Sequence, residues 1–224
     1  MRVVFMGSPA AAVPPLRALA EHGHDVALVV TNPPRRRGRR EEPSPTPVQA
    51  EAERLGLEVG HDLDRVTAVG AELGVVVAFG RLVPAGILER LRMVNLHFSL
   101  LPRWRGAAPV QRAILAGDER TGVCLMELEE GLDTGGLFGC SEIELTPSST
   151  AAGVTEVLSG LGAQLLVEKL AEPLGTPVPQ PAEGVTYASK ITVEELRLDW
   201  SRPAEELSRS VRVGEPGRPS ATAA

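Results

Sequence analysis

Aromatic residues are scarce in this 224-residue chain, where four phenylalanines, two tryptophans and one tyrosine make up 3% of the sequence. Hydrophobic residues still reach 43%, so valine, leucine and alanine must supply the core. A chain of this length buries about 70% of the surface that it exposes when unfolded. That is enough for one substantial domain.

Cysteine is nearly absent, because the chain has only Cys124 and Cys140. Two cysteines are too few for a disulfide framework. No group of His, Cys and Asp residues has the spacing of metal ligands. We therefore expect no metal and two buried free thiols, as is typical of a reducing cytoplasm.

Long apolar runs are also missing, since no stretch approaches the roughly 18 residues of a membrane span. The apolar N-terminal run ends at residues 7–9 (GSP), which makes it too short for a signal peptide. These residues lack the G-x-G-x-x-G pattern, so NAD binding is not supported. The net charge of −6 argues against general attraction to nucleic acid but permits a local basic patch. We expect a cytoplasmic protein that makes no membrane contact.

The first half of the chain alternates between short apolar runs and helical patterns. Residues 2–6 and 25–31 are predicted strands that flank a helix over residues 14–21. Such a unit of about 30 residues places its two strands parallel. Further strands are expected at residues 57–59, 74–79 and 94–99, and further helices at residues 48–55, 62–73, 84–91 and 109–116. This order predicts an α/β fold with a mostly parallel sheet and helices on both faces.

The pattern changes in the second half. Residues 123–128 and 137–145 are predicted strands, and Ser149 or Thr150 caps a helix that runs to about Leu170. Residues 173–186 contain four prolines and are expected to wrap around the domain without regular structure. We divide the chain into a catalytic domain (1–190), a linking region (191–212) and a tail (213–224). The tail is rich in Gly, Pro, Ser, Thr and Ala, so we expect it to be disordered.

Residues 94–102 (VNLHFSLLP) carry the polar pattern that points most clearly to a site. Successive strand residues point to opposite faces, so Asn95, His97 and Ser99 should share one face of a buried strand. Pro102 and Gly106 then break the strand. Ligands bind at the carboxyl ends of strands in open α/β sheets, which makes this stretch the candidate active site.

Three residues suit transfer of an acyl-type group to an amine. Asn95 can donate a hydrogen bond to a developing oxyanion, and the imidazole of His97 gains and loses a proton near neutral pH. Asp133 lies in a glycine-bounded loop, residues 131–136 (GLDTGG), that can approach a neighbouring strand end. A carboxylate there would orient His97 and favour its protonated form. The alternative is a hydrogen-bonded core histidine and an aspartate that only caps a turn.

Two motifs in this chain resemble the signatures of the folate-dependent formyltransferases: residues 95–109 (NLHFSLLPRWRGAAP) and residues 131–135 (GLDTG). Four stretches are most similar to the methionyl-tRNA formyltransferase family, namely residues 6–9 (MGSP), 103–111 (RWRGAAPVQ), 187–191 (YASKI) and 198–200 (LDW). The similarity extends over residues 1–212.

The resemblance implies a Rossmann-like formyltransferase fold and 10-formyltetrahydrofolate as the formyl donor. The methionyl α-amine of the initiator tRNA would attack the formyl carbon, and the product would serve translation initiation. Asn95 and protonated His97 would stabilise the oxyanion, while Asp133 would hold His97. The residues that would line the folate site are Ser99, Leu100, Leu101, Pro102, Phe79 and Gly80.

A basic loop has five arginines within six residues: Arg35, Arg36, Arg37, Arg39 and Arg40. Such a run can neutralise several phosphates and give salt-sensitive RNA binding. The resemblance implies a tRNA-contacting loop at this position. A solvated charge run with no partner remains the alternative.

The resemblance fades after Arg212, so we expect the chain to lack most of the C-terminal β-barrel that this family has. We also expect a monomer. The sequence departs from the family pattern at Ala11 and Gly136. Two other functions stay open: formylation of a small amine, such as glycinamide ribonucleotide or an amino sugar nucleotide, and a non-catalytic remnant that binds folate or tRNA.

Overall fold

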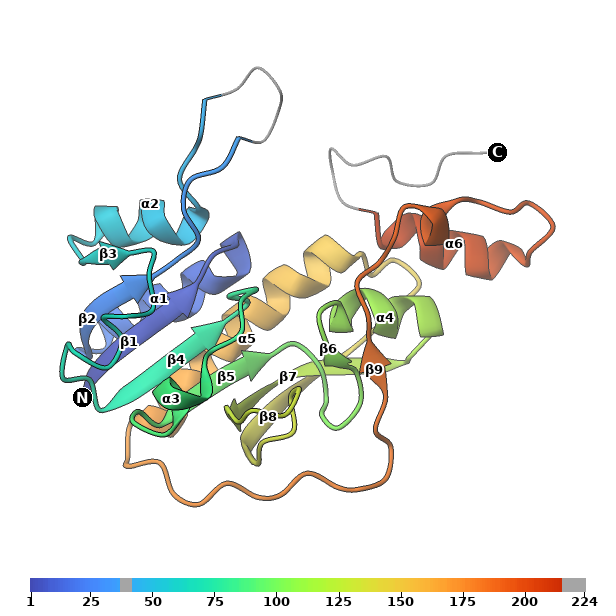
Figure 1. Cartoon of the computed structure of the whole chain (residues 1–224). Coiled ribbons are helices and arrows are strands. Elements are labelled where there is room, and N and C mark those ends of the chain that lie inside the picture. Colours follow the sequence, from blue (N-terminus) through green and yellow to red (C-terminus); the bar gives the residue numbers. More distant parts are fainter. Residues whose placement is uncertain (37–41, 215–224) are drawn as a thin grey trace.

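The structure of the chain, a computed structural model, describes residues 1–36 and 42–214 (Figure 1). Its strands are β1 (Arg2–Gly7), β2 (Asp25–Val30), β3 (Val59–Gly60), β4 (Leu73–Val77), β5 (Met93–His97), β6 (Arg105–Gly106), β7 (Arg120–Glu127), β8 (Leu137–Glu144) and β9 (Tyr187–Ala188). Its helices are α1 (Val13–Glu21), α2 (Pro47–Arg54), α3 (Ala85–Leu88), α4 (Pro109–Ala116), α5 (Ala151–Leu170) and α6 (Ala204–Arg212), with 3-10 turns at Ala10–Ala12 and Glu194–Leu196.

A seven-stranded sheet of order β3-β2-β1-β4-β5-β7-β8 forms the centre of the fold. The five strands from β3 to β5 are parallel, while β7 runs antiparallel to both β5 and β8. The predicted mostly parallel α/β fold is therefore confirmed. Strands β2, β1, β4 and β5 end at one edge, which is where an open sheet of this kind binds ligands.

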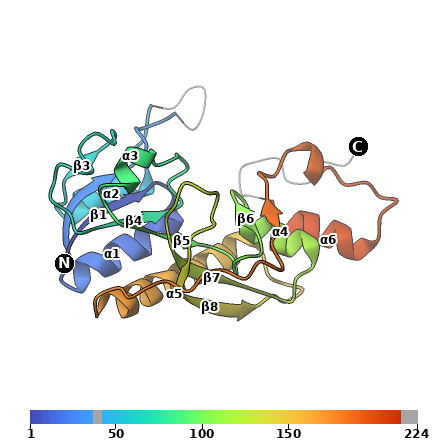
Figure 2. The ribbon, with the colours of Figure 1, turned by 60° about the horizontal axis from the view of Figure 1, so that its bottom comes forward.

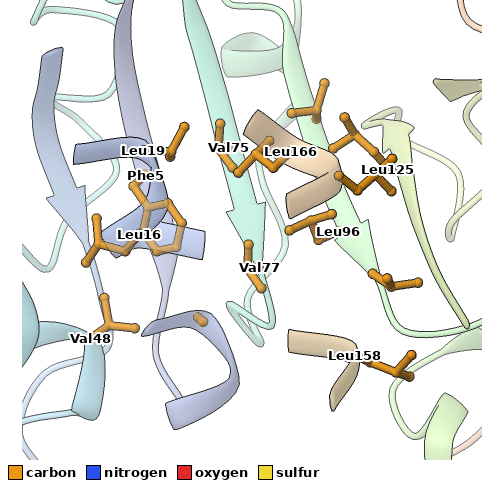
Figure 3. Packing of buried hydrophobic residues seen from close by; sticks show 14 of the residues in the cluster. Phe5, Leu16, Leu19, Val48, Val75, Val77, Leu96, Leu125, Leu158 and Leu166 are labelled. Carbon is orange, nitrogen blue, oxygen red and sulfur yellow. The ribbon is translucent and has the colours of Figure 1, made fainter. Parts of the chain in front are cut away.

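The central strands are buried on both faces because alternate residues enter different hydrophobic clusters. In β1, Val3 and Phe5 belong to a cluster that α1 and α5 cover, and Val4 and Met6 belong to a second cluster on the opposite face. Figure 3 shows the first cluster, in which Leu16 and Leu166 pack against strand residues. Helices α1 and α5 lie on one side of the sheet, and the short α3 lies on the other (Figure 2).

Two predicted helices on the second face differ from the structure. Residues 63–69 form turns and bends and Leu73 already belongs to β4, so the helix predicted for residues 62–73 was wrong. Val66 is buried in the second cluster while Leu63 and Val69 pack around it, and this packing produced an apolar spacing that resembled a helix. The helix predicted for residues 84–91 is reduced to the single turn of α3.

The long helix α5 matches its prediction closely. The side chain of Thr150 accepts a hydrogen bond from the backbone N–H of Gly153, which makes Thr150 the N-cap. The helix ends at Leu170 as expected. None of the helices in the described part of the chain combines the length and the apolar character that a membrane span requires.

Cys124 and Cys140 form a disulfide, so the prediction of two free thiols was wrong. They lie opposite each other on β7 and β8 with their Cα atoms 4.0 Å apart. Cys124 also pairs with His97 across β5 and β7. Paired residues share a face of the sheet, so the disulfide lies on the same face as His97. The strand register, which the sequence spacing does not reveal, brings the two cysteines together.

The C-terminal part of the described chain packs against the domain. Arg112 of α4 donates hydrogen bonds to the Ser189 carbonyl and to Glu195, which holds the segment after β9. Val213 is buried in the first cluster. The first residue of the predicted tail is therefore packed against the domain. Residues 215–224 of that tail lie outside the described part of the chain.

Candidate active site

The carboxyl end of β5 carries Asn95 and His97 on one face of the sheet. Their neighbours Val94 and Leu96 belong to the first hydrophobic cluster, whereas Met93 belongs to the second. The alternation therefore places Asn95 and His97 on one shared face, as the sequence predicted, and this face lies opposite α5. Both are buried, with relative exposures of 9% and 6%.

Ser99 lies two residues beyond the end of β5, so its place on the face of Asn95 and His97 stays a prediction. The strand ends at His97, and Ser99 is completely buried with its hydroxyl donating to the backbone carbonyl of Arg103 at 2.6 Å. Ser99 therefore stabilises the loop that follows the strand.

Asp133 approaches His97 from the loop between β7 and β8. One carboxylate oxygen, Oδ2, lies 3.5 Å from Nδ1 of His97 and accepts a hydrogen bond from the backbone N–H of Gly106 at 2.7 Å. The other imidazole nitrogen, Nε2, lies 2.8 Å from the carbonyl oxygen of Trp104 and donates to it. A doubly protonated imidazole satisfies both neighbours, since a carbonyl and a carboxylate can only accept.

Asn95 differs from its neighbours because no side chain or backbone group in the described part of the chain hydrogen-bonds its amide. A buried polar side chain normally has such a partner. The Asn95 amide therefore remains available to a bound substrate beside the His97–Asp133 pair.

Three non-glycine residues around this edge have left-handed backbone conformations: Ala78, Trp104 and Asp133, with φ of 46°, 63° and 50°. Each costs about 1–2 kcal/mol relative to an ordinary conformation. Such residues persist only where surrounding contacts hold them, and they cluster at functional sites.

Trp104 is held by Asp118, whose Oδ2 accepts a hydrogen bond from the indole N–H at 2.7 Å. Arg103 stacks over the tryptophan ring and donates to both carboxylate oxygens of Asp118, and these hydrogen bonds raise the pKa of its guanidinium. The anchored Trp104 presents its carbonyl to His97. These contacts hold the Trp104 carbonyl oxygen in place beside Nε2 of His97.

The residues predicted to line a folate site lie on both sides of Asn95 and His97. Phe79 and Gly80 follow β4, the parallel neighbour of β5, and residues 99–102 follow β5 itself. The side chains of Phe79 and Leu101 are buried in hydrophobic clusters, so their backbone would be the part that faces a ligand. Leu100 and Pro102 are half-buried.

A hollow of about 490 Å³ lies on another side of the Asp133 loop. It is lined by Arg105, Glu129, Thr134, Gly136, Pro177, Pro179, Gln180, Pro181, Ala182 and Val185. None of the predicted folate residues contributes to it. In the described part of the chain, no three His, Cys, Asp or Glu side chains form a group that could hold a metal.

The basic loop leaves the carboxyl end of β2 and returns to α2 (Figure 1). Arg35 and Arg36 are exposed, while Arg37, Arg39 and Arg40 lie outside the described residues. The backbones of Arg35 and Ser44 exchange two hydrogen bonds of 3.2 Å, which close the stem of the loop. Strands β2 and β5 are part of the same parallel set, so the loop leaves the sheet at the edge that carries His97.

Comparisons with known proteins agree with this architecture. The family model described as "Formyl transferase" matches residues 1–170. The methionyl-tRNA formyltransferase of Dinoroseobacter shibae is 50% identical over 223 residues, which cover 95% of this chain and 75% of that protein. The corresponding enzyme of Mesorhizobium japonicum is 48% identical over 226 residues, covering 95% and 71%.

Solved structures share the fold at low sequence identity. A methionyl-tRNA formyltransferase from Clostridium thermocellum has a TM-score of 0.74 at 17% identity, covering all of this chain and 88% of that one. An N-formyltransferase from Helicobacter canadensis, solved with folinic acid and dTDP-3-aminofucose, has a TM-score of 0.74 at 17% identity over 94% and 79%. From the family match and the identity to its curated relatives, this chain belongs to the formyl transferase family, among the methionyl-tRNA formyltransferases.

Proposed function

We propose that this chain uses Asn95, His97 and Asp133 to transfer a formyl group from 10-formyltetrahydrofolate to the α-amine of methionyl-initiator tRNA. One observation carries the assignment of these residues: the side chain of Asn95, which is 9% exposed and has no hydrogen-bond partner in the described part of the chain, lies on the same strand face as a His97–Asp133 pair. Both substrates are found in the cytoplasm, so we expect the protein to act there. We also expect it to be a monomer.

The reaction requires a charge to be stabilised and a proton to be moved. The amine attacks the formyl carbon, the formyl carbon–nitrogen bond of the donor breaks, and the carbonyl oxygen is transiently negative. One proton leaves the attacking amine and one reaches the departing nitrogen, so the overall reaction is balanced. Asn95 donates a hydrogen bond to the oxyanion, and the positive charge of protonated His97 stabilises it further.

Asp133 keeps the imidazole in position for this role. Its carboxylate faces Nδ1 of His97, and the hydrogen bond from Gly106 fixes the carboxylate itself. A carboxylate beside an imidazole fixes the orientation of the ring. Asp133 also assists the movement of the proton from the amine.

The substrates would enter at the carboxyl edge of the sheet. We expect the donor to bind between Phe79–Gly80 and residues 99–102, which follow neighbouring strands. We expect Arg35 and Arg36, which are exposed, to contact phosphates of the tRNA together with the other arginines of the loop.

The test is formyl transfer from 10-formyltetrahydrofolate to charged initiator tRNA by the 224-residue chain, with His97→Ala as the matched variant. We expect product with the unmodified chain and at least 100-fold less with the variant. Folded protein that forms no product would contradict the proposal. Product from a free amine substrate instead would favour a small-amine formyltransferase, and folate binding without any product would favour a non-catalytic remnant.

A further inference from the structure

Gln180 is half-buried and joins the proline-rich segment to the Asp133 loop. Its amide nitrogen donates to the backbone carbonyls of Asp133 and Gly135, each at 2.8 Å. Its carbonyl oxygen accepts from Nε and Nη2 of Arg105, at 3.1 and 2.7 Å. All four hydrogen-bonding positions of the glutamine amide are thereby used.

The partners determine which way this amide faces. Backbone carbonyls only accept hydrogen bonds and a guanidinium only donates them. A flipped amide would place its NH₂ group against Arg105 and its oxygen against two carbonyls, which would remove all four bonds. A residue that replaced Gln180 would keep these hydrogen bonds only if its side chain had the same length and ended in two N–H donors and one acceptor oxygen.

The turn that Gln180 holds is strained. Asp133 has a φ of 50°, a conformation that an aspartate keeps only when its surroundings enforce it. Gly135 lies so close to the chain that an added Cβ would come within 1.9 Å of the Glu127 carbonyl oxygen. The two bonds from Gln180 link the carbonyls at either end of this Asp133–Gly135 turn.

Arg105 and Gly106 hold the backbone carbonyl and the side-chain carboxylate of Asp133, respectively, with Arg105 acting through Gln180. The Arg105 side chain fixes Gln180, which holds the Asp133 backbone, while the adjacent Gly106 N–H holds the Asp133 carboxylate. Both residues are in β6, which pairs with β9. Asp133 is therefore held at its carbonyl and at its carboxylate by neighbouring residues of one strand.

The proline-rich segment is itself fixed next to Gln180. Val178 and Leu137, the first residue of β8, exchange backbone hydrogen bonds of 2.7 and 2.8 Å. The segment also crosses near Arg92, which donates to the carbonyls of Leu174 and Gly175. Gln180 thus reaches the Asp133 turn from an anchored backbone.

We propose that Gln180 is a positioning residue that sets the left-handed turn at Asp133 and so aims its carboxylate at His97. The inference rests on the proposed catalytic role of Asp133, and it extends the functional unit to a segment that carries none of the catalytic residues. Gln180 acts through Asp133 and not through contact with either substrate. Its loss should therefore change the rate of the chemical step and leave substrate binding nearly unchanged.

Two variants of the 224-residue chain test this role. Gln180→Met keeps a side chain of similar length without the four hydrogen bonds. Gln180→Glu keeps the shape and the acceptor for Arg105, but it places an acceptor oxygen where the amide nitrogen donates to the carbonyls of Asp133 and Gly135. We expect kcat for formylation of charged initiator tRNA to fall by about 10- to 100-fold, because small misplacements of catalytic groups have effects of this size. The KM for tRNA and for the folate donor should stay within about twofold of the original.

The matched control is Gln164→Glu on the exposed side of α5, for which we expect no change in kcat. Circular dichroism at the assay temperature shows whether each variant is folded. A Gln180→Met kcat within twofold of the original would overturn the proposal. A loss that appears only as a raised KM would also overturn it, because Gln180 would then act on substrate binding.

Hydrogen exchange separates this inference from the proposed function. The Gly106 amide is protected by the Asp133 carboxylate, so we expect Gln180→Met to accelerate exchange at Gly106 by at least 10-fold. Unchanged exchange would overturn the positioning role even if the chain showed no transferase activity. Full activity in Asp133→Asn together with faster Gly106 exchange in Gln180→Met would instead refute the catalytic role of Asp133 and leave the hold on the turn intact.

Discussion

Asp133 lies with its carboxylate 3.5 Å from Nδ1 of His97, although 36 positions separate the two residues in the sequence. The carboxylate also accepts the N–H of Gly106, so three segments of the chain meet at this point. Because the carboxylate has these two neighbours, a substitution can remove its charge beside His97 and still keep an acceptor for the Gly106 N–H.

Asp133→Asn keeps an oxygen that can accept the Gly106 hydrogen bond but removes the negative charge beside His97. We expect kcat for tRNA formylation to fall by about 100-fold or more, with little change in thermal unfolding. Steady-state kinetics and a melting curve measure both effects. Asp64→Asn, at an exposed position, is the charge-matched control, and equal kcat values in the two variants would refute the role of Asp133.

Asn95→Ala tests whether this amide serves the substrate instead of the fold. Because no group in the described part of the chain bonds the Asn95 side chain, its removal should lower the free energy of unfolding by less than about 1 kcal/mol. Loss of an oxyanion donor should nevertheless lower kcat by about 100- to 1,000-fold. Urea unfolding and single-turnover formylation distinguish these expectations, and a variant that is destabilised but fully active would show that Asn95 is structural.

Local patterns in the sequence predicted the elements whose burial is regular. The alternation around Asn95 and His97 correctly predicted the shared face, and the cap expected at Ser149 or Thr150 predicted where α5 begins. The same reasoning failed where a loop supplies the packing, as at Val66, whose neighbours form turns over the second cluster. An irregular segment can bury apolar residues at helical spacing without forming a helix.

Contacts that depend on how distant segments pair could not be predicted from the residues around each position. The Cys124–Cys140 disulfide depends on which residues of β7 and β8 face each other. Gln180 stands among prolines in a segment without periodicity, and nothing near it in the sequence indicates that it reaches Asp133. Resemblance to a family could point to the residues that we propose as catalytic, while the residue that we propose to orient Asp133 emerged only from the folded chain.

Glu51 of α2 forms ion pairs with Arg17 of α1 and with Arg54 of its own helix. These pairs make the stability of the fold depend on pH. Its carboxylate accepts from Nε of Arg17 at 2.7 Å and from Nε and Nη2 of Arg54 at 2.9 and 2.8 Å. These hydrogen bonds, first from Arg54 and then from Arg17, lower the pKa of Glu51 to about 2. Because the folded-state pKa lies below the unfolded value, this stabilisation is complete above about pH 4.5 and is lost as the pH falls towards 2.

Glu51→Gln should therefore lower the free energy of unfolding at pH 7 by about 2 kcal/mol. This is less than the full pKa shift implies, because the side chains of Arg17 and Arg54 are 45% and 58% exposed and water screens the pairs. Urea unfolding at pH 7, 5 and 3 should show a smaller difference between the variant and the original at pH 3 than at pH 7. Glu89→Gln, at an exposed position, controls for the general loss of a carboxylate, and a difference that stays constant with pH would contradict the assignment.

Arg35 and Arg36 are the described members of the basic loop, and both are exposed at the edge of the sheet that carries the site. If they neutralise tRNA phosphates, the double variant Arg35→Ala/Arg36→Ala should raise the KM for tRNA while kcat at saturating tRNA stays the same. The slope of log affinity against log salt concentration should become less steep by about 1 for each lost phosphate contact. The charge-matched control is Arg65→Ala/Arg90→Ala, because these exposed arginines precede β4 and β5 at the opposite edge of the sheet. An unchanged KM and salt slope in the first variant would assign these two arginines to a solvated loop, whereas equal effects in both variants would show that tRNA responds to overall charge and not to this loop.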